Sequence, residues 1–298
     1  MPTWQAIFAK RLDLFVVEKT GCSRAEARRL IEQRQVRVDG HYAEKGSVVV
    51  PGSLVELREA LSSSMEKRPQ PDPDAPLEVI RKEEIWLALR KPAHMATHPL
   101  LPGERGTLAN ALVARFPECA GAADDPREGG MVHRLDSETT GVILAARNQS
   151  AWRALRSSFS HGQVEKEYLA IVLGEPPEEM EVDAPLLHAG RKMRIDPEGQ
   201  SAHTDYLRLA VGKGCSLVRA KMHTGRMHQV RVHAASKGVP LVGDELYGGP
   251  PAPWGAGFFL HASRISFPSP VPDSEERLFV VCRPSIEQQD LLRKLGLG

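Results

Sequence analysis

The sequence predicts a sheet-centred α+β fold, and three observations lead to this prediction. The chain has 298 residues, which is about two domains' worth. A segment at 59–78 is rich in proline and charge and lacks hydrophobic periodicity, as a linker does. After this segment, short strand-like apolar runs alternate with a few helical ones. We therefore expect an N-terminal unit at 10–58, a linker at 59–78 and a larger domain at 79–298.

Two short helices are expected at the start of the N-terminal unit. The first is indicated by an apolar face formed by Leu12, Phe15 and Val16. Gly21 can close this helix as a C-terminal cap. The segment 23–26 has the capping-box pattern, in which a serine caps a new helix and a glutamate three residues later reaches back to it. The two helices are therefore expected to meet at a tight turn.

The second helix has a strongly basic surface, and strands follow it. The surface of this helix carries Arg24, Arg28, Arg29 and Arg34. A strand at 36–38 enters a hairpin turn at 39–40, because an Asp-Gly pair tolerates the positive φ that such turns need. Strands at 48–50 and 54–57, with a Pro-Gly turn between them, complete the unit.

This order of elements resembles the S-four-type RNA-binding domain, also called the alpha-L fold. The matching segments are 11–13, 23–31, 36–40 and 51–55. The resemblance implies that Arg24, Arg28 and Arg29 contact RNA. The alternative is a solvated helix face that binds nothing, which is the usual meaning of a run of charges.

In the larger domain, the apolar pattern predicts both strands and helices. Strands are expected at 85–89, 142–146, 168–173, 217–220 and 278–282. Helices are expected at 108–116, 151–159 and 227–236, the first of them starting after Thr107.

Composition excludes several classes of protein. With 41% hydrophobic and 26% charged residues, the chain is neither disordered nor fibrous, and no apolar run approaches the roughly 18 residues of a membrane span. The N-terminus lacks the basic and apolar segments of a signal peptide, so a cytoplasmic location is expected. The four cysteines are too widely spaced for a disulfide framework or a CxxC zinc site. We expect buried, reduced thiols.

Motifs of common cofactor enzymes are absent. The sequence contains no GxxxxGK[ST], GxGxxG, GxSxG or HExxH pattern. His223, His228 and His233 recur every five residues, a spacing that does not place them on one ligand face of a helix. We therefore expect neither a metal nor a nucleotide cofactor.

One window of the chain concentrates positive charge, although the net charge is only +1. No acidic residue occurs between Asp205 and Asp244, a stretch that holds seven lysines and arginines. Such a patch attracts phosphate backbones by counterion release. The alternative is an exposed cationic surface without a partner.

A second feature is the charged loop at 132–141, which leads directly into the apolar run at 142–146. Asp136 lies in this loop, two residues after Arg134. Taken alone, such a pair is often a structural ion pair. The residues around this pair indicate another role for Asp136.

From 84 to 284 the sequence resembles the RluA family of RNA pseudouridine synthases. The matching blocks are 89–93, 98–99, 106–112, 133–141, 166–174, 202–204, 224–233, 240–249 and 260–262. The resemblance implies a catalytic domain with a mostly antiparallel mixed sheet and flanking helices. It also implies an isomerase that cuts uracil from its ribose in RNA, rotates the base and rejoins it through carbon 5, with no metal or cofactor.

By the same resemblance, Asp136 is the catalytic carboxylate, because a carboxylate can stabilise or capture the positive charge that develops on the sugar. Arg231 is its basic partner, and Tyr168 lies against the reacting base. Arg231 could instead be one more phosphate contact, and Tyr168 an ordinary core residue. Whether Asp136 acts as nucleophile or as base stays open.

Further residues of these blocks are expected to contact RNA. They are Arg134, Lys166, Arg226, His228 and Gln229. Arg134 matches the arginine that stabilises the space left by a flipped base, with an ion pair to a neighbouring acid as the alternative. Lys166 is expected to guide phosphate, and the alternative is an exposed lysine without a specific role. His133 is expected to be structural. The sequence departs from the family pattern at His94, Thr97 and Thr140.

The expected substrate is a structured RNA, large-subunit ribosomal RNA, bound by a monomer. Transfer RNA is the alternative substrate. Two other functions are a non-catalytic RNA-binding assembly factor and a hydrolase with a carboxylate pair. The hydrolase would need Glu138 or Asp244 as its second carboxylate, and the sequence assigns neither a role.

Overall fold

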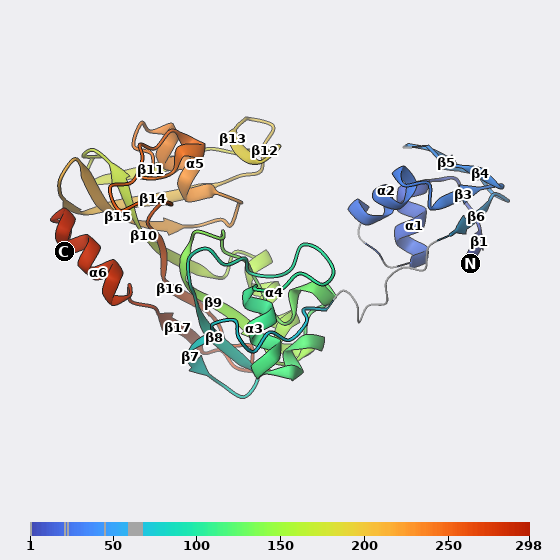
Figure 1. The fold of residues 1–298 in the computed structure, drawn as a ribbon, viewed down its shortest axis with the longest axis horizontal. Coiled ribbons are helices and arrows are strands. Elements are labelled where there is room, and N and C mark those ends of the chain that lie inside the picture. Colours follow the sequence, from blue (N-terminus) through green and yellow to red (C-terminus); the bar gives the residue numbers. More distant parts are fainter. Residues whose placement is uncertain (1, 21, 23, 45, 59–67) are drawn as a thin grey trace. The chain divides into compact units, whose positions relative to one another are not determined.

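The structure, a computed structural model, describes residues 2–20, 22, 24–44, 46–58 and 68–298 (Figure 1). The chain divides into two compact units, Met1–Glu66 and Lys67–Gly298, each with its own hydrophobic core. In the described part of the chain, no helix is long and apolar enough to cross a membrane. All four cysteines are buried and free, as expected.

In its described residues, the first unit has two helices packed on short strands. The helices are α1 (Leu12–Thr20) and α2 (Arg24–Glu32). One sheet has the order β1 (Thr3–Gln5), β6 (Leu54–Leu57), β3 (Val36–Val38) and β4 (His41–Tyr42), and β2 (Lys10–Arg11) pairs with β5 (Val48–Val49). Asp39 and Gly40 have the positive φ that the turn prediction required. The predicted caps at Gly21 and Ser23 lie outside the described residues, as does the side chain of Glu26.

Both predicted boundaries around the first unit differ from the structure. Strand β1 pairs with β6, so the unit begins before residue 10. The predicted linker at 59–78 extends too far, because the segment 68–77 packs on the second unit: Ala75 and Leu77 are buried in its core, and the Asn110 amide donates to the Gln70 carbonyl at 2.7 Å. Residues 59–67 lie outside the described part.

The second unit is built on one nine-stranded sheet. In spatial order its strands are β11 (Glu179–Asp183), β14 (His203–Val211), β15 (Cys215–Met222), β10 (Glu165–Leu173), β16 (Leu260–Pro268), β9 (Thr140–Ala146), β8 (Trp86–Lys91) and β7 (Glu78–Lys82), and β17 (Arg277–Val281) also pairs with β16. Among the strand pairs of the described residues, only β9 and β16 run parallel. The prediction of a mostly antiparallel mixed sheet is confirmed.

Helices and a hairpin flank this sheet. They are α3 (Leu108–Arg115), α4 (Gln149–Ser160), α5 (Gln229–Ser236), α6 (Ile286–Leu295) and the hairpin of β12 (Leu186–Ala189) with β13 (Lys192–Ile195). Short 3-10 turns lie at Pro117–Gly121, Pro126–Glu128 and Glu245–Tyr247. Figure 1 shows α3 and α4 beside β8 and β9, whereas α5 lies by β14. Thr107 caps α3 through a capping box with Asn110, as the predicted start requires.

The predicted strands and helices of this unit all occur, but others were missed. The missed elements are β7, β11, β14, β16, the hairpin β12–β13 and α6. Polar residues interrupt several of these strands, so their apolar signal is weak. Strand β14, for example, begins His-Thr-Asp and leaves alternate side chains partly exposed.

Candidate active site

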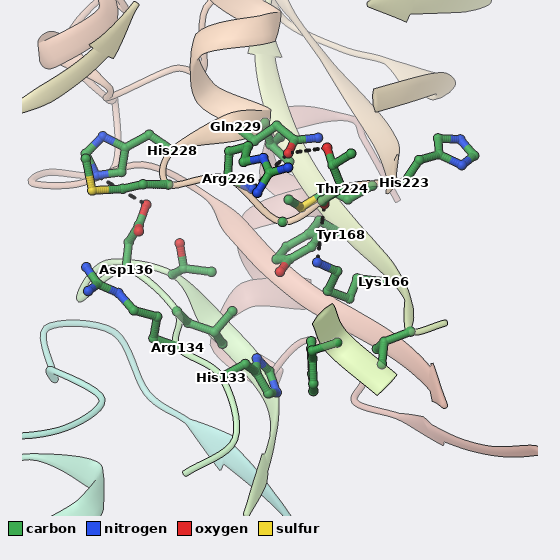
Figure 2. A pocket seen from close by; sticks show the side chains of 18 of the residues that line it. His133, Arg134, Asp136, Lys166, Tyr168, His223, Thr224, Arg226, His228 and Gln229 are labelled. Carbon is green, nitrogen blue, oxygen red and sulfur yellow. Dashed lines mark hydrogen bonds and ion pairs between the residues drawn. The ribbon is translucent and has the colours of Figure 1, made fainter. Parts of the chain in front are cut away.

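A cleft of about 590 Å³ lies in the second unit, lined by the loop before β9 and the loop between β15 and α5 (Figure 2). Strand β10 forms its floor. All the site residues that the sequence predicted in the larger domain line this cleft: Arg134, Asp136, Lys166, Tyr168, Arg226, His228, Gln229 and Arg231. Residues up to 97 positions apart in the sequence are thus brought together, since Arg134 on the loop before β9 and Arg231 on α5 line one cleft.

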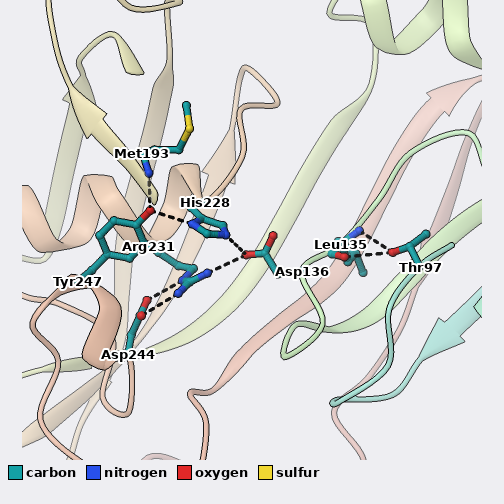
Figure 3. Close-up of polar contacts among 8 residues, drawn as sticks. All are labelled: Thr97, Leu135, Asp136, Met193, His228, Arg231, Asp244 and Tyr247. Atoms are coloured by element: carbon teal, nitrogen blue, oxygen red, sulfur yellow. Dashed lines mark hydrogen bonds and ion pairs between the residues drawn. The ribbon is translucent and has the colours of Figure 1, made fainter. Parts of the chain in front are cut away.

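Asp136 is joined to a buried network of charges (Figure 3). Nη1 of Arg231 donates to Oδ2 of Asp136 at 3.1 Å. Nε and Nη2 of the same arginine donate to both carboxylate oxygens of Asp244, at 2.6 and 2.8 Å. The Asp136 side chain keeps 23% of its surface exposed, whereas Asp244 keeps 1%. One carboxylate therefore faces the cleft, and the other anchors the arginine from behind.

Arg231 stays positively charged although it is buried. Burial alone would lower its pKa, but the hydrogen bonds and negative charge of Asp244, with a smaller contribution from Asp136, hold the pKa above its ordinary value. The guanidinium also packs 4.4 Å from the Phe258 ring and 5.0 Å from the Tyr247 ring. A fixed cation therefore lies beside Asp136.

Asp244 is the functional residue whose role the sequence analysis did not assign. The sequence held a signal for it, because Asp244 ends the acid-free window and directly follows Gly243. A buried arginine also needs a carboxylate partner. Several acidic residues of the sequence could be the partner of Arg231, and only the fold shows that Asp244 takes this role.

Tyr168 lies on β10 with 7% of its surface exposed. Burial, together with the nearby charge of Asp136, raises the pKa of its phenol above the ordinary value. The phenol thus stays protonated in neutral solution. Tyr168 presents a neutral ring to the cleft beside Asp136, a surface on which a base can stack.

His228 forms a second connection to Asp136. It begins α5 with a left-handed φ of 54°, and its Nδ1 lies 2.8 Å from the Tyr247 hydroxyl. The same hydroxyl accepts the Met193 backbone N–H at 2.8 Å. The other ring nitrogen of His228, Nε2, faces Oδ2 of Asp136 at 3.8 Å. Burial lowers the His228 pKa, although Asp136 opposes this shift.

Hydrogen bonds from two buried side chains, Lys91 and Thr97, hold the loop that carries Asp136. Nζ of Lys91, a fully buried lysine, donates to the carbonyls of Pro92, Met95 and Ser137 at 2.7–2.8 Å. The Thr97 hydroxyl donates to the Leu135 carbonyl at 3.0 Å and accepts the Leu135 N–H at 3.2 Å. Thr97 departs from the family pattern, and its hydroxyl holds the residue just before Asp136 in place (Figure 3).

Two predicted RNA contacts look different in the structure. The Gln229 amide is buried and donates to the His203 carbonyl and the Thr204 hydroxyl, while its oxygen accepts from Thr224 and from the Arg226 backbone. All four of its hydrogen-bonding positions are used within the protein, so Gln229 shapes the loop, and its contact with RNA stays a prediction. Lys166 is half-buried, not exposed: its Nζ donates to the Thr224 carbonyl at 3.3 Å.

Burial also changes the acidity of the cleft's cations and histidines. It lowers the pKa of Lys166 to about 8, with a further contribution from Arg226. It lowers the pKa of His133 to about 3, and Nε2 of this neutral ring accepts the Leu144 N–H at 3.0 Å. His133 is thus a structural residue, as expected. Arg134 lies exposed at the rim of the cleft.

The basic helix α2 of the first unit bonds to a buried carboxylate, Asp13, on α1. Arg24 and Arg28 each donate to Asp13, at 3.1 and 3.2 Å, and Arg11 joins them. Burial acts to raise the pKa of Asp13, but the three arginines lower it to about 2. Arg24 and Arg28 remain nearly half exposed, and Arg29 is exposed. This face can bind phosphate, with two of its arginines positioned by Asp13.

Known proteins with similar sequences share one chemistry. The family model described as RNA pseudouridylate synthase matches residues 85–236, and the S-four domain model matches residues 10–55. An "Uncharacterized RNA pseudouridine synthase" of Chloroflexus aurantiacus is 37% identical, over 80% of this chain and 76% of its own. The "Ribosomal large subunit pseudouridine synthase D" of Xanthomonas campestris pv. campestris is 33% identical, over 88% and 85%. Its Escherichia coli namesake is 32% identical, over 82% and 74%.

Solved structures agree. "Human RNA Pseudouridylate Synthase Domain Containing 4" superposes with a TM-score of 0.59 at 25% identity, covering 74% of this chain and 94% of its own. The family match includes the loop of Asp136, the strand of Tyr168 and the helix of Arg231. With a carboxylate held by a buried arginine in a basic cleft, and with these relatives, the chain belongs to the RNA pseudouridylate synthase family, the isomerases that convert uridine in RNA to pseudouridine.

Proposed function

We propose that this protein isomerises specific uridines of large-subunit ribosomal RNA, with Asp136 as the catalytic carboxylate. The observation that carries the proposal is the Asp136–Arg231–Asp244 arrangement at the base of a basic cleft. The choice of RNA rests on the relatives from Xanthomonas campestris and Escherichia coli, whose names specify the large ribosomal subunit.

The reaction starts when the bond between the anomeric carbon and the ring nitrogen of uracil breaks. Positive charge then develops on the sugar, and the Asp136 carboxylate stabilises or captures it. Arg231 orients that carboxylate through its hydrogen bond, and Asp244 holds the guanidinium in place. The freed base turns against the Tyr168 ring and bonds through carbon 5 to the anomeric carbon, which gives up any bond to Asp136. Carbon 5 then loses its proton, and the ring nitrogen that left the sugar gains one. Every atom of the uridine stays in the product except for exchanged protons.

The target uridine has to leave its stack before Asp136 can reach its sugar. Arg134 is exposed at the rim near Asp136 and is placed to occupy the space that the base leaves (Figure 2). Lys166 and Arg226 lie further along the same cleft, where a flanking phosphate would pass.

Lys166 makes RNA affinity depend on pH. Its pKa of about 8 means that its positive charge is present below pH 8 and is lost above it. Phosphate favours the charged form, so we expect the Kd for RNA to rise between pH 7 and 9, by up to about tenfold per pH unit above 8. Binding titrations at several pH values measure this. The Lys166→Arg variant stays charged and should lose the dependence; a variant with the wild-type profile would contradict the assignment.

Removal of residues 1–66 tests the RNA-binding unit. The second unit has its own core, so we expect the truncated enzyme to keep turnover on a short stem-loop while its affinity for full-length ribosomal RNA falls by at least about tenfold. Arg29→Glu is a point variant with the fold intact, because this side chain is exposed. Equal affinity and site choice in wild type, truncation and Arg29→Glu would show that this unit does not bind the substrate.

Other functions make different predictions. A carboxylate-pair hydrolase has little support here, since Asp244 is engaged by Arg231 on both oxygens and Glu138 forms an ion pair with His94. Transfer RNA as substrate and a non-catalytic assembly role stay alternatives, and a monomeric state and a cytoplasmic location stay predictions.

One assay separates these alternatives. Transcripts of large-subunit ribosomal RNA, small-subunit ribosomal RNA and transfer RNA, each with tritium at carbon 5 of uridine, are incubated with the protein. We expect tritium release from the large-subunit transcript above all. Release from transfer RNA alone would favour the alternative substrate, free uracil would indicate a hydrolase, and binding without release would indicate an assembly factor.

A further inference from the structure

Four polar side chains gather on one face of the sheet, at the end of the cleft away from Asp136. They are Glu181 on β11, His203 and Asp205 on β14, and His223 just after β15. The strand register explains the grouping: Glu181 pairs with Asp205, and the pairing of Thr204 with Met222 places His223 beside His203. Since side chains alternate along a strand, all four project from the same face.

That face is not the one that α5 covers. The neighbours Thr204 and Tyr206 point the other way, where they bond to His233 and to the Val230 carbonyl of α5. The cluster therefore lies at a surface that solvent reaches: His203 is 31% exposed and His223 is 38% exposed. Figure 2 shows His223 at the opposite end of the cleft from Asp136.

Nitrogen and oxygen ligands converge at this point. Nε2 of His203 lies 3.0 Å from Oε1 of Glu181 and 3.1 Å from Oδ1 of Asp205. Nε2 of His223 lies 2.6 Å from the other oxygen of Asp205. One ligand atom from each of His203, Asp205 and His223 lies within 4.8 Å of the others. Among the described residues, Nε2 of His203 is buried without a hydrogen-bond partner of good geometry.

These distances suit a zinc ion after a small movement. Two ligands of a tetrahedral zinc with bonds of about 2.0–2.1 Å lie about 3.3 Å apart. The His203–Glu181 and His203–Asp205 distances already approach this value. The two imidazole rings stack with centroids 4.4 Å apart, so a rotation of these partly exposed rings turns both nitrogens toward one ion.

We propose that His203, His223 and Asp205, with Glu181 as a fourth ligand, form a binding site for a divalent transition-metal ion of the zinc class. Imidazole and carboxylate ligands favour Zn²⁺ over Mg²⁺, which prefers oxygen ligands in an octahedral arrangement. The site is separate from the isomerisation chemistry, and it does not depend on which RNA the protein modifies.

A metal ion here would stiffen one wall of the cleft. His223 directly precedes Thr224–Arg226, which line the cleft, and its backbone N–H donates to the His203 carbonyl at 3.1 Å. The His203 N–H in turn donates to the Thr224 hydroxyl at 3.0 Å. An ion that ties the two histidine rings together therefore reinforces contacts that already hold this segment.

The test uses the full-length protein without an affinity tag or RNA, treated with a chelator and then dialysed. We expect calorimetric titration with ZnCl₂ to give one bound ion per chain, Co²⁺ to give visible bands of a low-symmetry four-coordinate site, and MgCl₂ to give neither. His203→Ala and His223→Ala should both lose the site, and His188→Ala, a change at an exposed histidine of the β12–β13 hairpin, should keep it. Zinc should raise the Tm of the wild type and of His188→Ala, and it should not raise the Tm of His203→Ala or His223→Ala.

Unfolding of the metal-free variants, monitored by circular dichroism, checks that they are folded. If the histidine variants do not fold, Asp205→Asn and Glu181→Gln, which keep side-chain size, replace them and are expected to weaken zinc binding. Stoichiometric binding that survives the changes at His203 and His223, or no binding by the wild-type protein, overturns the proposal. Because no RNA is present, either result is independent of the pseudouridine assays.

Discussion

Replacement of Asp136 by asparagine is expected to reduce turnover at least about a thousandfold while RNA binding persists. Asparagine has nearly the same shape and keeps an oxygen that can accept the hydrogen bond from Nη1 of Arg231. It lacks the negative charge that the developing sugar cation requires. RNA affinity should be unchanged or tighter, because a negative charge is removed from a basic cleft. Single-turnover tritium release and a binding titration measure the two quantities.

Glu138→Gln is the matched control for this variant. Glu138 lies two residues further along the same loop, and its carboxylate pairs with the exposed His94 at 3.0 Å. Loss of that surface pair should leave turnover close to the wild-type value. Turnover by Asp136→Asn within tenfold of the wild type would exclude Asp136 as the catalytic carboxylate.

The second large effect is expected from Asp244→Asn, although Asp244 itself does not reach the cleft. The change leaves a buried guanidinium with one carboxylate in place of two. Losing one partner of a buried ion pair typically costs about 3–5 kcal/mol, which corresponds to a Tm lower by about 6–20 °C for a unit of this size. Arg231 should also lose its orientation toward Asp136, with a fall in turnover of about a hundredfold well below Tm.

Tryptophan fluorescence suits the Tm measurement, because Trp86, Trp152 and Trp254 all lie in the second unit. Asp124→Asn is the control, since Asp124 pairs with Arg153 at the surface, where both side chains are more than half exposed. That change should alter stability by less than about 1 kcal/mol. An Asp244→Asn enzyme with wild-type Tm and turnover would contradict the anchoring role.

Local patterns in the sequence predicted much of this fold. The Asp-Gly pair at 39–40 has the turn geometry that its residues favour, and Thr107 starts a helix as a capping residue. The buried strands β8 and β9 are continuous apolar runs and were visible as such. Each of these elements depends mainly on residues that are neighbours in the chain, so a single sequence contains the information.

Long-range pairing explains what the sequence did not reveal. Strand β14 carries polar residues on its exposed face, so its pattern is weak until β11 and β15 are placed beside it. Asp244 and Gln229 have roles that depend on partners across the fold, and nothing local distinguishes an acid that anchors an arginine from one that is solvated. The family resemblance located the cleft residues, whereas the interactions that hold them in place came from the structure.

The most direct test of the proposed function is a map of pseudouridine in large-subunit ribosomal RNA from cells that lack this gene, read by carbodiimide modification and reverse transcription. Cells are supplied with the wild-type gene, with Asp136→Asn or with neither. We expect one or a few stops that require the wild-type gene and do not return with Asp136→Asn. Identical stops in all three strains would contradict the proposal that this enzyme uses Asp136 to modify large-subunit ribosomal RNA.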